Sequence, residues 1–175
     1  SAAYESIMGN GTVTLLETPE KKERALTLLM KHAAPGANLV FRPEMLEAMK
    51  NFYKNRFGVE LETDQIMSMY GSQEGMAHIA LVMCDPGDVV LVPNPGYPVF
   101  GMGPQLMGAK VETYPLYAEN NFLPDFADIP EETAKAAKFM IISYPANPVC
   151  SVADDSFYEK AIAFAKKYNV ILLHD

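Results

Sequence analysis

Two polar residues near the end of the chain follow apolar runs and could take part in chemistry. Asn147 lies in the proline-rich stretch 144–150, directly after the apolar run 138–143, and Asp175 follows the apolar run 170–173 and a histidine. An amide and a carboxylate that converge on one crevice could hold a heteroaromatic cofactor. The amide would bind an oxygen of such a cofactor, and the carboxylate would bind its protonated ring nitrogen. Both residues are therefore candidate ligand contacts.

The elements around them predict where these residues lie. Both apolar runs are short and rich in β-branched residues, which is typical of strands buried on both faces. Between them, apolar residues recur at helical spacing from Phe157 to Tyr168, so the segment reads as a strand–helix–strand unit. Ligands bind at the carboxyl ends of strands in open α/β sheets, where Asn147 and Asp175 stand. Neighbours on a strand point to opposite faces, so we do not expect His174 and Asp175 to form a hydrolase pair.

A second candidate is the start of a helix near residue 71. The run 66–70 predicts a short strand, Gly71 allows a close turn, and apolar residues continue at helical spacing to Met83. Free backbone N–H groups and the helix dipole suit a phosphate at such a place. Ser72 and Gln73 open this helix. The alternative is an ordinary serine N-cap without a ligand.

A third candidate is Tyr97. It lies in the segment 93–98, where three prolines predict a rigid loop without regular structure. A flat ring that is held still can stack on a planar ligand. The alternative is a tyrosine that packs the loop against the sheet.

Together these motifs resemble a known family. Tyr144-Pro-Ala-Asn-Pro148 followed by Leu-Leu-His-Asp175 is similar to the fold type I pyridoxal-phosphate enzymes, specifically the class I/II aminotransferases. Gly71-Ser-Gln-Glu-Gly75 and the segment 85–98 match the same family in the same order. The resemblance runs from about Gly9 to Asp175 and is strongest to the branch of LL-diaminopimelate, aspartate and alanine aminotransferases.

The resemblance assigns roles to these residues and implies pyridoxal 5'-phosphate as the cofactor. Ser72 and Gln73 take the positions that contact its phosphate, and Tyr97 takes the position whose ring stacks on the cofactor. Asn147 takes the position that donates to the phenolic oxygen, and Asp175 the one that keeps the ring nitrogen protonated. For Asp175 alone, capping of a following element is an alternative role.

The chain departs from the family pattern in three places. The loop 38–42 contains no tyrosine, where the family carries one that reaches the neighbouring subunit's cofactor phosphate. After Pro148 the family continues Thr-Gly, whereas this chain has Val149 and Cys150. No lysine lies in the serine-rich context of the family's Schiff-base lysine, so no catalytic residue is assigned and we expect that lysine to lie beyond Asp175. We therefore expect the chain to be the N-terminal half of a larger enzyme, inactive alone.

The composition of the chain argues against some classes of binding partner. The chain has 175 residues, a net charge of −8 and 49% hydrophobic residues. An acidic chain without basic patches argues against nucleic acids and anionic membranes as partners. No signal peptide, metal-ligand cluster or run long enough to span a bilayer is visible. Cys84 and Cys150 form neither metal spacing nor a disulfide framework, which favours the cytoplasm.

We expect an α/β fold with three layers, α/β/α, and a mostly parallel sheet, the truncated large domain of a pyridoxal-phosphate-dependent transferase. Residues 1–40 are expected to form an arm and a small-domain segment, and residues 41–175 the N-terminal half of the large domain. The expected helices are 19–34, 43–57, 71–83, 100–107, a short one after 128, and 157–168; the expected strands are 66–70, 89–92, 110–114, 138–143 and 170–175.

The expected function is an aminotransferase that moves an amino group between a small α-amino acid and a 2-oxo acid. The resemblance further implies a homodimer in the complete enzyme. One alternative is another fold type I enzyme such as a carbon–sulfur lyase, which shares the cofactor cradle. A second is a non-catalytic aminotransferase-like sensing domain of a regulator, or a degenerate fragment.

Overall fold

The computed structural model describes residues 43–67, 69 and 71–175. The chain divides into two compact units with the boundary between residues 68 and 69, and each is described by itself. The helix expected over 19–34 and the loop 38–42 lie outside the described residues. The assignment of 1–40 and 41–175 to two domains of a larger enzyme stays a prediction.

The described part of the first unit contains one long helix. Helix α2 spans Pro43–Phe57, as expected, and the short 3-10 helix η1 spans Thr63–Gln65. The helix ends where Gly58 turns the chain and donates its N–H to the Lys54 carbonyl at 3.0 Å. The strand expected over 66–70 is wrong for residues 66, 67 and 69, which form no regular structure. A run of apolar residues forms a strand only where a neighbouring strand pairs with it.

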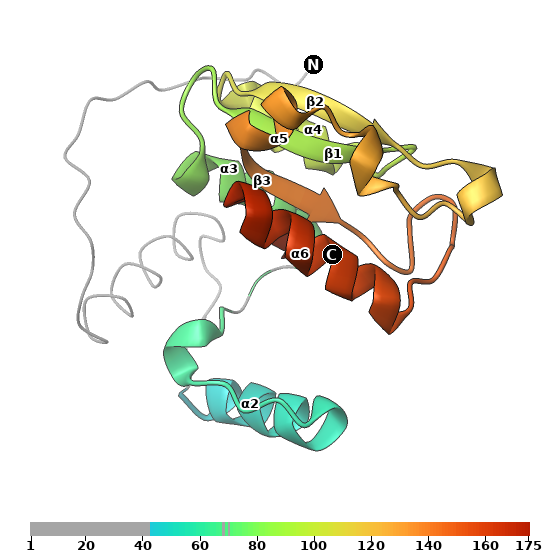
Figure 1. Ribbon diagram of the computed structural model, residues 1–175. Helices are drawn as coiled ribbons and strands as arrows, with labels where there is room; N and C mark the ends of the chain where they lie inside the picture. The colour runs from blue at the N-terminus through green and yellow to red at the C-terminus, as the bar shows by residue number, and fades with distance from the viewer. Residues whose placement is uncertain (1–42, 68, 70) are drawn as a thin grey trace, which may run out of the picture. The chain divides into compact units, whose positions relative to one another are not determined.

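The second unit is built around a parallel sheet of four strands in the order β2-β1-β3-β4. The strands are β1 (Val89–Asn94), β2 (Lys110–Pro115), β3 (Ala137–Ile142) and β4 (Ile171–His174). The helices are α3 (Ser72–Met83), α4 (Val99–Leu106), α5 (Glu131–Ala136) and α6 (Asp155–Tyr168), with the short 3-10 helices η2 (Ala118–Asn120) and η3 (Phe126–Asp128). Figure 1 labels helices α3 to α6 and strands β1 to β3.

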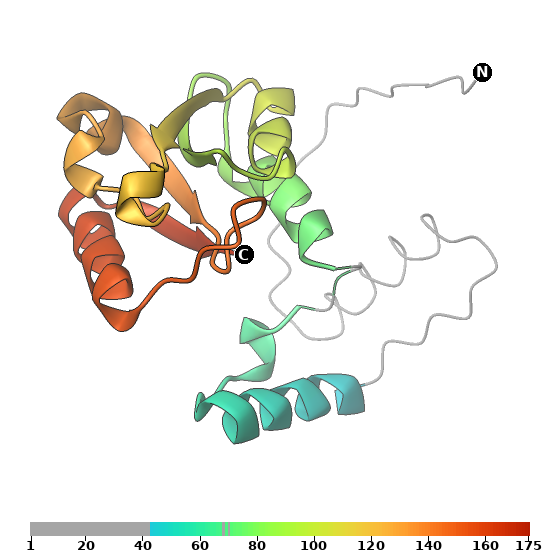
Figure 2. The same cartoon turned by 90° about the vertical axis from the view of Figure 1, so that its right-hand side faces the viewer.

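Alternation along the strands divides the core into two layers of side chains. Val90 and Val92 of β1 pack with residues of α3 and α4, whereas Leu91 packs on the other face with residues of α5 and α6. Strand β3 alternates in the same way, as the period of two residues requires. Figure 2 shows α3 and α4 on one side of the sheet and α5 and α6 on the other. The expected three-layer α/β/α fold is confirmed.

Two details of the sheet correct the expectations. Strand β1 extends through Pro93 and Asn94, which were expected to lie outside regular structure and instead pair with β2. Because β1 pairs with β3 only as far as Leu91, a residue without an N–H group is tolerated beyond that point. Strand β4, expected to be buried on both faces, lies at the edge of the described sheet, and Ile171 is 49% exposed.

Candidate functional site

The chain reverses its direction of travel across the sheet between β1 and β3. It moves from β1 outward to β2, then returns past β1 to β3 and continues to β4. The carboxyl ends of β1 and β3 therefore border a topological switch point, the place where open α/β sheets bind ligands.

A buried tyrosine holds the sheet together where β1 and β3 separate. Tyr114 of β2 donates its hydroxyl to the Ile141 carbonyl at 2.6 Å, reaching across to β3. Burial raises the pKa of Tyr114 well above its usual value, so the hydroxyl keeps its proton and remains a donor. The sequence carried no sign of this bridge, because its two partners are 27 residues apart.

The loop after β1 presents Tyr97 at this edge. Gly96 packs so closely on the Pro93 carbonyl that a β-carbon has no room there. The Tyr97 ring is half-buried, lies against the core layer of α3 and α4, and contacts Phe100 edge to face at 6.0 Å between centroids. It is therefore anchored on one side, and part of its surface is left open.

The start of α3 carries Ser72 and Gln73. Gly71 is the N-cap, with φ of 84°, a conformation that glycine adopts without strain. The expected alternative of a serine N-cap is wrong, since Ser72 lies inside the helix. Gly71 has no side chain to bond the first N–H groups, which lack partners within a helix. Both Ser72 and Gln73 are exposed, and the described residues offer their side chains no hydrogen-bond partner.

Asn147 lies in a closed loop after β3. The Ala146 N–H donates to the Ser151 carbonyl at 2.9 Å, and the Cys150 N–H donates to the Ala146 carbonyl. Tyr144 fixes the base of the loop, because it is buried and donates its hydroxyl to the Phe122 carbonyl at 2.9 Å. Burial raises its pKa to about 12. The Asn147 side chain is exposed and has no hydrogen-bond partner among the described residues.

Asp175 continues the line of β4. Its N–H donates to the Ile142 carbonyl at 3.0 Å, so the backbone remains extended. Leu173 packs with the layer of α3 and α4, and the alternation of the strand places Asp175 on the same face. His174 lies on the opposite face, where its Nε2 is 3.1 Å from the Tyr158 hydroxyl. The Asp175 carboxylate has no hydrogen-bond or ion-pair partner among the described residues.

The structure thus brings the candidates to one edge of one sheet. Tyr97, the first turn of α3 and Asp175 share the face of α3 and α4, as the packing of Tyr97, Met76 and Leu173 on one core layer shows. Asn147 lies in the loop that follows β3, at the same edge. These groups suit an anionic, planar ligand with an acceptor oxygen and a ring nitrogen, and their unsatisfied side chains leave room for its bonds.

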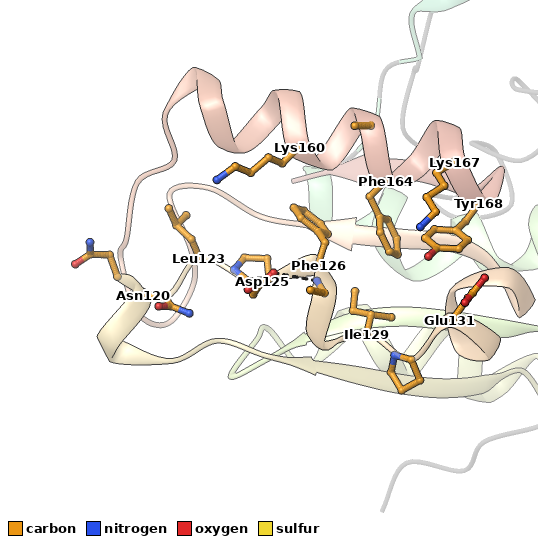
Figure 3. A pocket seen from close by; sticks show the side chains of 15 residues that line it. Asn120, Leu123, Asp125, Phe126, Ile129, Glu131, Lys160, Phe164, Lys167 and Tyr168 are labelled. Carbon is orange, nitrogen blue, oxygen red and sulfur yellow. Dashed lines mark hydrogen bonds between the residues drawn. The ribbon is translucent and has the colours of Figure 1, made fainter.

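A cavity of about 850 Å³ lies elsewhere, between helix α6 and the segment 120–131 (Figure 3). Phe126 and Phe164 stack at 5.2 Å in its wall, and Lys160 and Lys167 border it. None of the five candidate residues lines it. The cavity is lined instead by residues of α6 and of the segment 120–131.

Two further findings concern metals and membranes. Among the described residues, no group of three or more His, Cys, Asp or Glu side chains could hold a metal ion. Within the same residues, no helix has both the length and the apolar character to cross a membrane.

Comparison with known proteins identifies the family of this chain. A family model for aminotransferases of class I and II matches residues 9–175. The chain is 43% identical over 157 residues to an LL-diaminopimelate aminotransferase of Desulforudis audaxviator, covering 89% of this chain and 40% of that protein. It is 41% identical over 157 residues to an LL-diaminopimelate aminotransferase of Aquifex aeolicus, again covering 89% of this chain and 40% of that protein.

Solved structures agree with the family. The apo BacF structure of Bacillus subtilis superposes with a TM-score of 0.73 and 36% identity, covering 92% of this chain and 42% of that one. A probable N-succinyldiaminopimelate aminotransferase of Thermus thermophilus superposes with a TM-score of 0.72 and 30% identity, covering 91% of this chain and 44% of that one. The chain thus spans about 40% of the length of these relatives. It belongs to the class I and II aminotransferase family, whose members have the type I fold of pyridoxal-phosphate-dependent enzymes.

Proposed function

We propose that the complete protein containing this chain is a pyridoxal-phosphate-dependent aminotransferase. It transfers an amino group between a small α-amino acid and a 2-oxo acid. The observation that carries the proposal is the set of polar side chains without partners at the carboxyl edge of the sheet, Ser72, Gln73, Asn147 and Asp175, in a chain of this family. Because its relatives include LL-diaminopimelate aminotransferases, LL-diaminopimelate is the first amino donor to test.

The residues fit the cofactor group by group. The first turn of α3, whose N-cap Gly71 has no side chain, carries Ser72 and Gln73 and suits the phosphate, since N–H groups and the helix dipole both favour an anion there. The anchored ring of Tyr97 offers a flat surface for the pyridine ring. When bound, pyridoxal phosphate withdraws electrons from the α-carbon of the amino acid through its protonated ring.

Asn147 and Asp175 would each form a hydrogen bond with that ring, at two different atoms. The Asn147 amide would donate a hydrogen bond to the phenolic oxygen. The Asp175 carboxylate would accept one from the ring N–H, which favours the protonated form of the nitrogen. An unpaired carboxylate at the end of a strand is well placed for this role, because no other cation or donor in the described chain competes for it.

We further propose that the complete protein is a cytoplasmic homodimer. Two cysteines without a disulfide, Cys84 and Cys150, suit a reducing compartment. Exposed apolar side chains on α3 and α4, among them Val82 and Leu106, suit an association surface. Light scattering of the complete protein tests the dimer, and a well-behaved monomer would contradict it.

The carbon–sulfur lyase and sensing-domain alternatives are not favoured, because the curated relatives carry aminotransferase names. The test uses the complete protein loaded with pyridoxal phosphate, LL-diaminopimelate and a panel of 2-oxo acids. We expect a new amino acid to form only when both substrates are present. A parallel assay supplies sulfur amino acids, and release of pyruvate and ammonia from them, without amino transfer in either assay, would overturn the proposal in favour of a lyase.

A further inference from the structure

A contact on the far side of β4 from Asp175 joins the strand to helix α6. The Tyr158 hydroxyl lies 3.1 Å from His174 Nε2, and the two rings are 5.6 Å apart between centroids. Tyr158 is half-buried in the first turns of α6, and His174 precedes Asp175 directly.

The position of Asp175 depends on how the end of β4 is held. Strand β4 pairs with β3, and the Asp175 N–H donates to the Ile142 carbonyl, which fixes the backbone of Asp175 from the side of β3. A side-chain bond at His174 restrains the residue whose peptide group leads into Asp175.

The same part of α6 also contacts the loop that carries Asn147. Phe157 lies 4.8 Å from the Tyr144 ring and 5.3 Å from the Tyr158 ring, both edge to face. Tyr144 stands three residues before Asn147 and is fixed by its own hydrogen bond. A continuous series of rings therefore runs from the base of the Asn147 loop, through Phe157 and Tyr158, to His174.

We propose that Tyr158 is a positioning residue that acts through His174 to hold Asp175 against the cofactor. This inference rests on the proposed function, because it presupposes that Asp175 binds the ring nitrogen. Tyr158 itself touches neither cofactor nor substrate in this account. Its hydroxyl fixes the end of β4 from the face opposite the site, and the ring series keeps that end in register with the Asn147 loop.

The test uses the complete protein loaded with pyridoxal phosphate. Tyr158→Phe removes only the hydroxyl, and His174→Leu removes the ring nitrogen. His174→Gln keeps a donor and an acceptor near the position of Nε2. The matched control is Tyr168→Phe, the same change on the same helix. Single-turnover rates with an amino-acid substrate and the visible spectrum of the bound cofactor are recorded for each variant.

We expect Tyr158→Phe and His174→Leu each to slow the half-reaction about two- to tenfold, the range that one hydrogen bond supports. Both should also alter the cofactor spectrum, while substrate affinity stays unchanged. His174→Gln should restore most of the rate, and the double variant should be no slower than either single one. Equal behaviour of Tyr158→Phe and Tyr168→Phe in rate and spectrum would overturn the proposal.

The variant Asp175→Asn distinguishes a failure of the positioning role from a failure of the proposed contact between Asp175 and the cofactor. If Asp175→Asn slows the half-reaction and Tyr158→Phe does not, only the positioning role is wrong. If Asp175→Asn leaves the rate and the spectrum unchanged, the proposed cofactor contact is wrong, and the positioning role is overturned with it.

Discussion

The two ends of the parallel sheet differ in whether their polar side chains have partners within the chain. At the amino end, the Asp88 carboxylate accepts a hydrogen bond from the Asp85 N–H at 2.7 Å and forms an ion pair with Lys138 at 2.6 Å. At the carboxyl end, the Asn147 and Asp175 side chains have no partner among the described residues.

We interpret the difference as one between polar groups that stabilise the fold and polar groups that would bind the proposed cofactor. A side chain that is satisfied within the chain contributes to stability and has little to offer a ligand. An unsatisfied side chain at a switch point adds little to stability and keeps its hydrogen-bonding capacity for a ligand. Changes to side chains that are satisfied within the chain should therefore affect unfolding, and changes to the unsatisfied side chains at the carboxyl end should affect the cofactor and the reaction.

The largest effect is expected from Asp175→Asn in the complete enzyme. The variant keeps the shape of the side chain but removes its charge, so the ring nitrogen of the cofactor is protonated less of the time. The loss of a buried charge-assisted hydrogen bond is worth about 1.5–3 kcal/mol, or at least about tenfold in rate. Single-turnover kinetics at saturating cofactor measure it, with the exposed Asp155→Asn as control. An unchanged rate would show that Asp175 has only a capping role.

Tyr114→Phe should destabilise the sheet without touching the site groups. It leaves the buried Ile141 carbonyl without the hydroxyl that now bonds it, a loss of about 1–3 kcal/mol in the free energy of unfolding. Urea unfolding monitored by circular dichroism gives the value, with the exposed Tyr117→Phe as control. Equal stability of the two variants would mean that the bridge between β2 and β3 contributes nothing.

Asp88→Asn tests the amino end. The Asp85 N–H, followed by Lys138, lowers the pKa of Asp88 below its ordinary 3.8 in the folded state. A lowered pKa contributes stability at pH values above 3.8, and that stability is lost as the pH falls through the folded pKa. The melting temperature of Asp88→Asn should therefore lie below that of the wild type at pH 7, and the two should converge below pH 3.8.

Asp85→Asn is the matched control for Asp88→Asn. The Asp85 carboxylate is 89% exposed and lies 3.9 Å from Lys138, so its loss should change little. The rate of the half-reaction should stay unchanged in both variants. A slower half-reaction in Asp88→Asn would contradict the separation between the two ends of the sheet.

The smallest effect is expected from Cys150→Gly. Cys150 has φ of 57°, a left-handed conformation that suits glycine, the residue that the family has at this position. Glycine relieves that strain, but it also gives the unfolded chain more conformational freedom, which opposes the gain. The net effect should be to stabilise the protein by about 0.5–1 kcal/mol. Cys150→Ser keeps the β-carbon and should leave the melting temperature unchanged. If glycine lowers it, the loop is not strained at Cys150.

Local patterns were sufficient to predict most of the elements. The helical spacing within 155–168 and the apolar run of β3 were read correctly, because their own residues determine their periodicity and burial. The partial exposure of β4 was not predicted, because it depends on which distant segments cover the strand. Pro93 and Asn94 were excluded from β1 on local grounds, although pairing with β2 alone tolerates a proline there.

In the candidate site, too, the features with a local sequence signal were predicted and the contacts between distant residues were not. Asn147 and Asp175 were found because each follows an apolar strand, a signal that is local. The Tyr158 contact with His174 was missed, because it joins residues 16 positions apart on two different elements. The serine N-cap alternative failed for a local reason, since Gly71 takes the cap position and places Ser72 inside the helix.

The protonation state of the cofactor's ring nitrogen tests the central claim most directly. Pyridoxal phosphate labelled with ¹⁵N in the ring is bound to the complete protein and to its Asp175→Asn variant, and the chemical shift of the nitrogen is recorded by NMR across neutral pH. We predict a protonated nitrogen in the wild type and a largely unprotonated one in Asp175→Asn. The same nitrogen shift in both proteins would contradict the assignment of Asp175, and with it the account of the sheet's carboxyl end as the cofactor site.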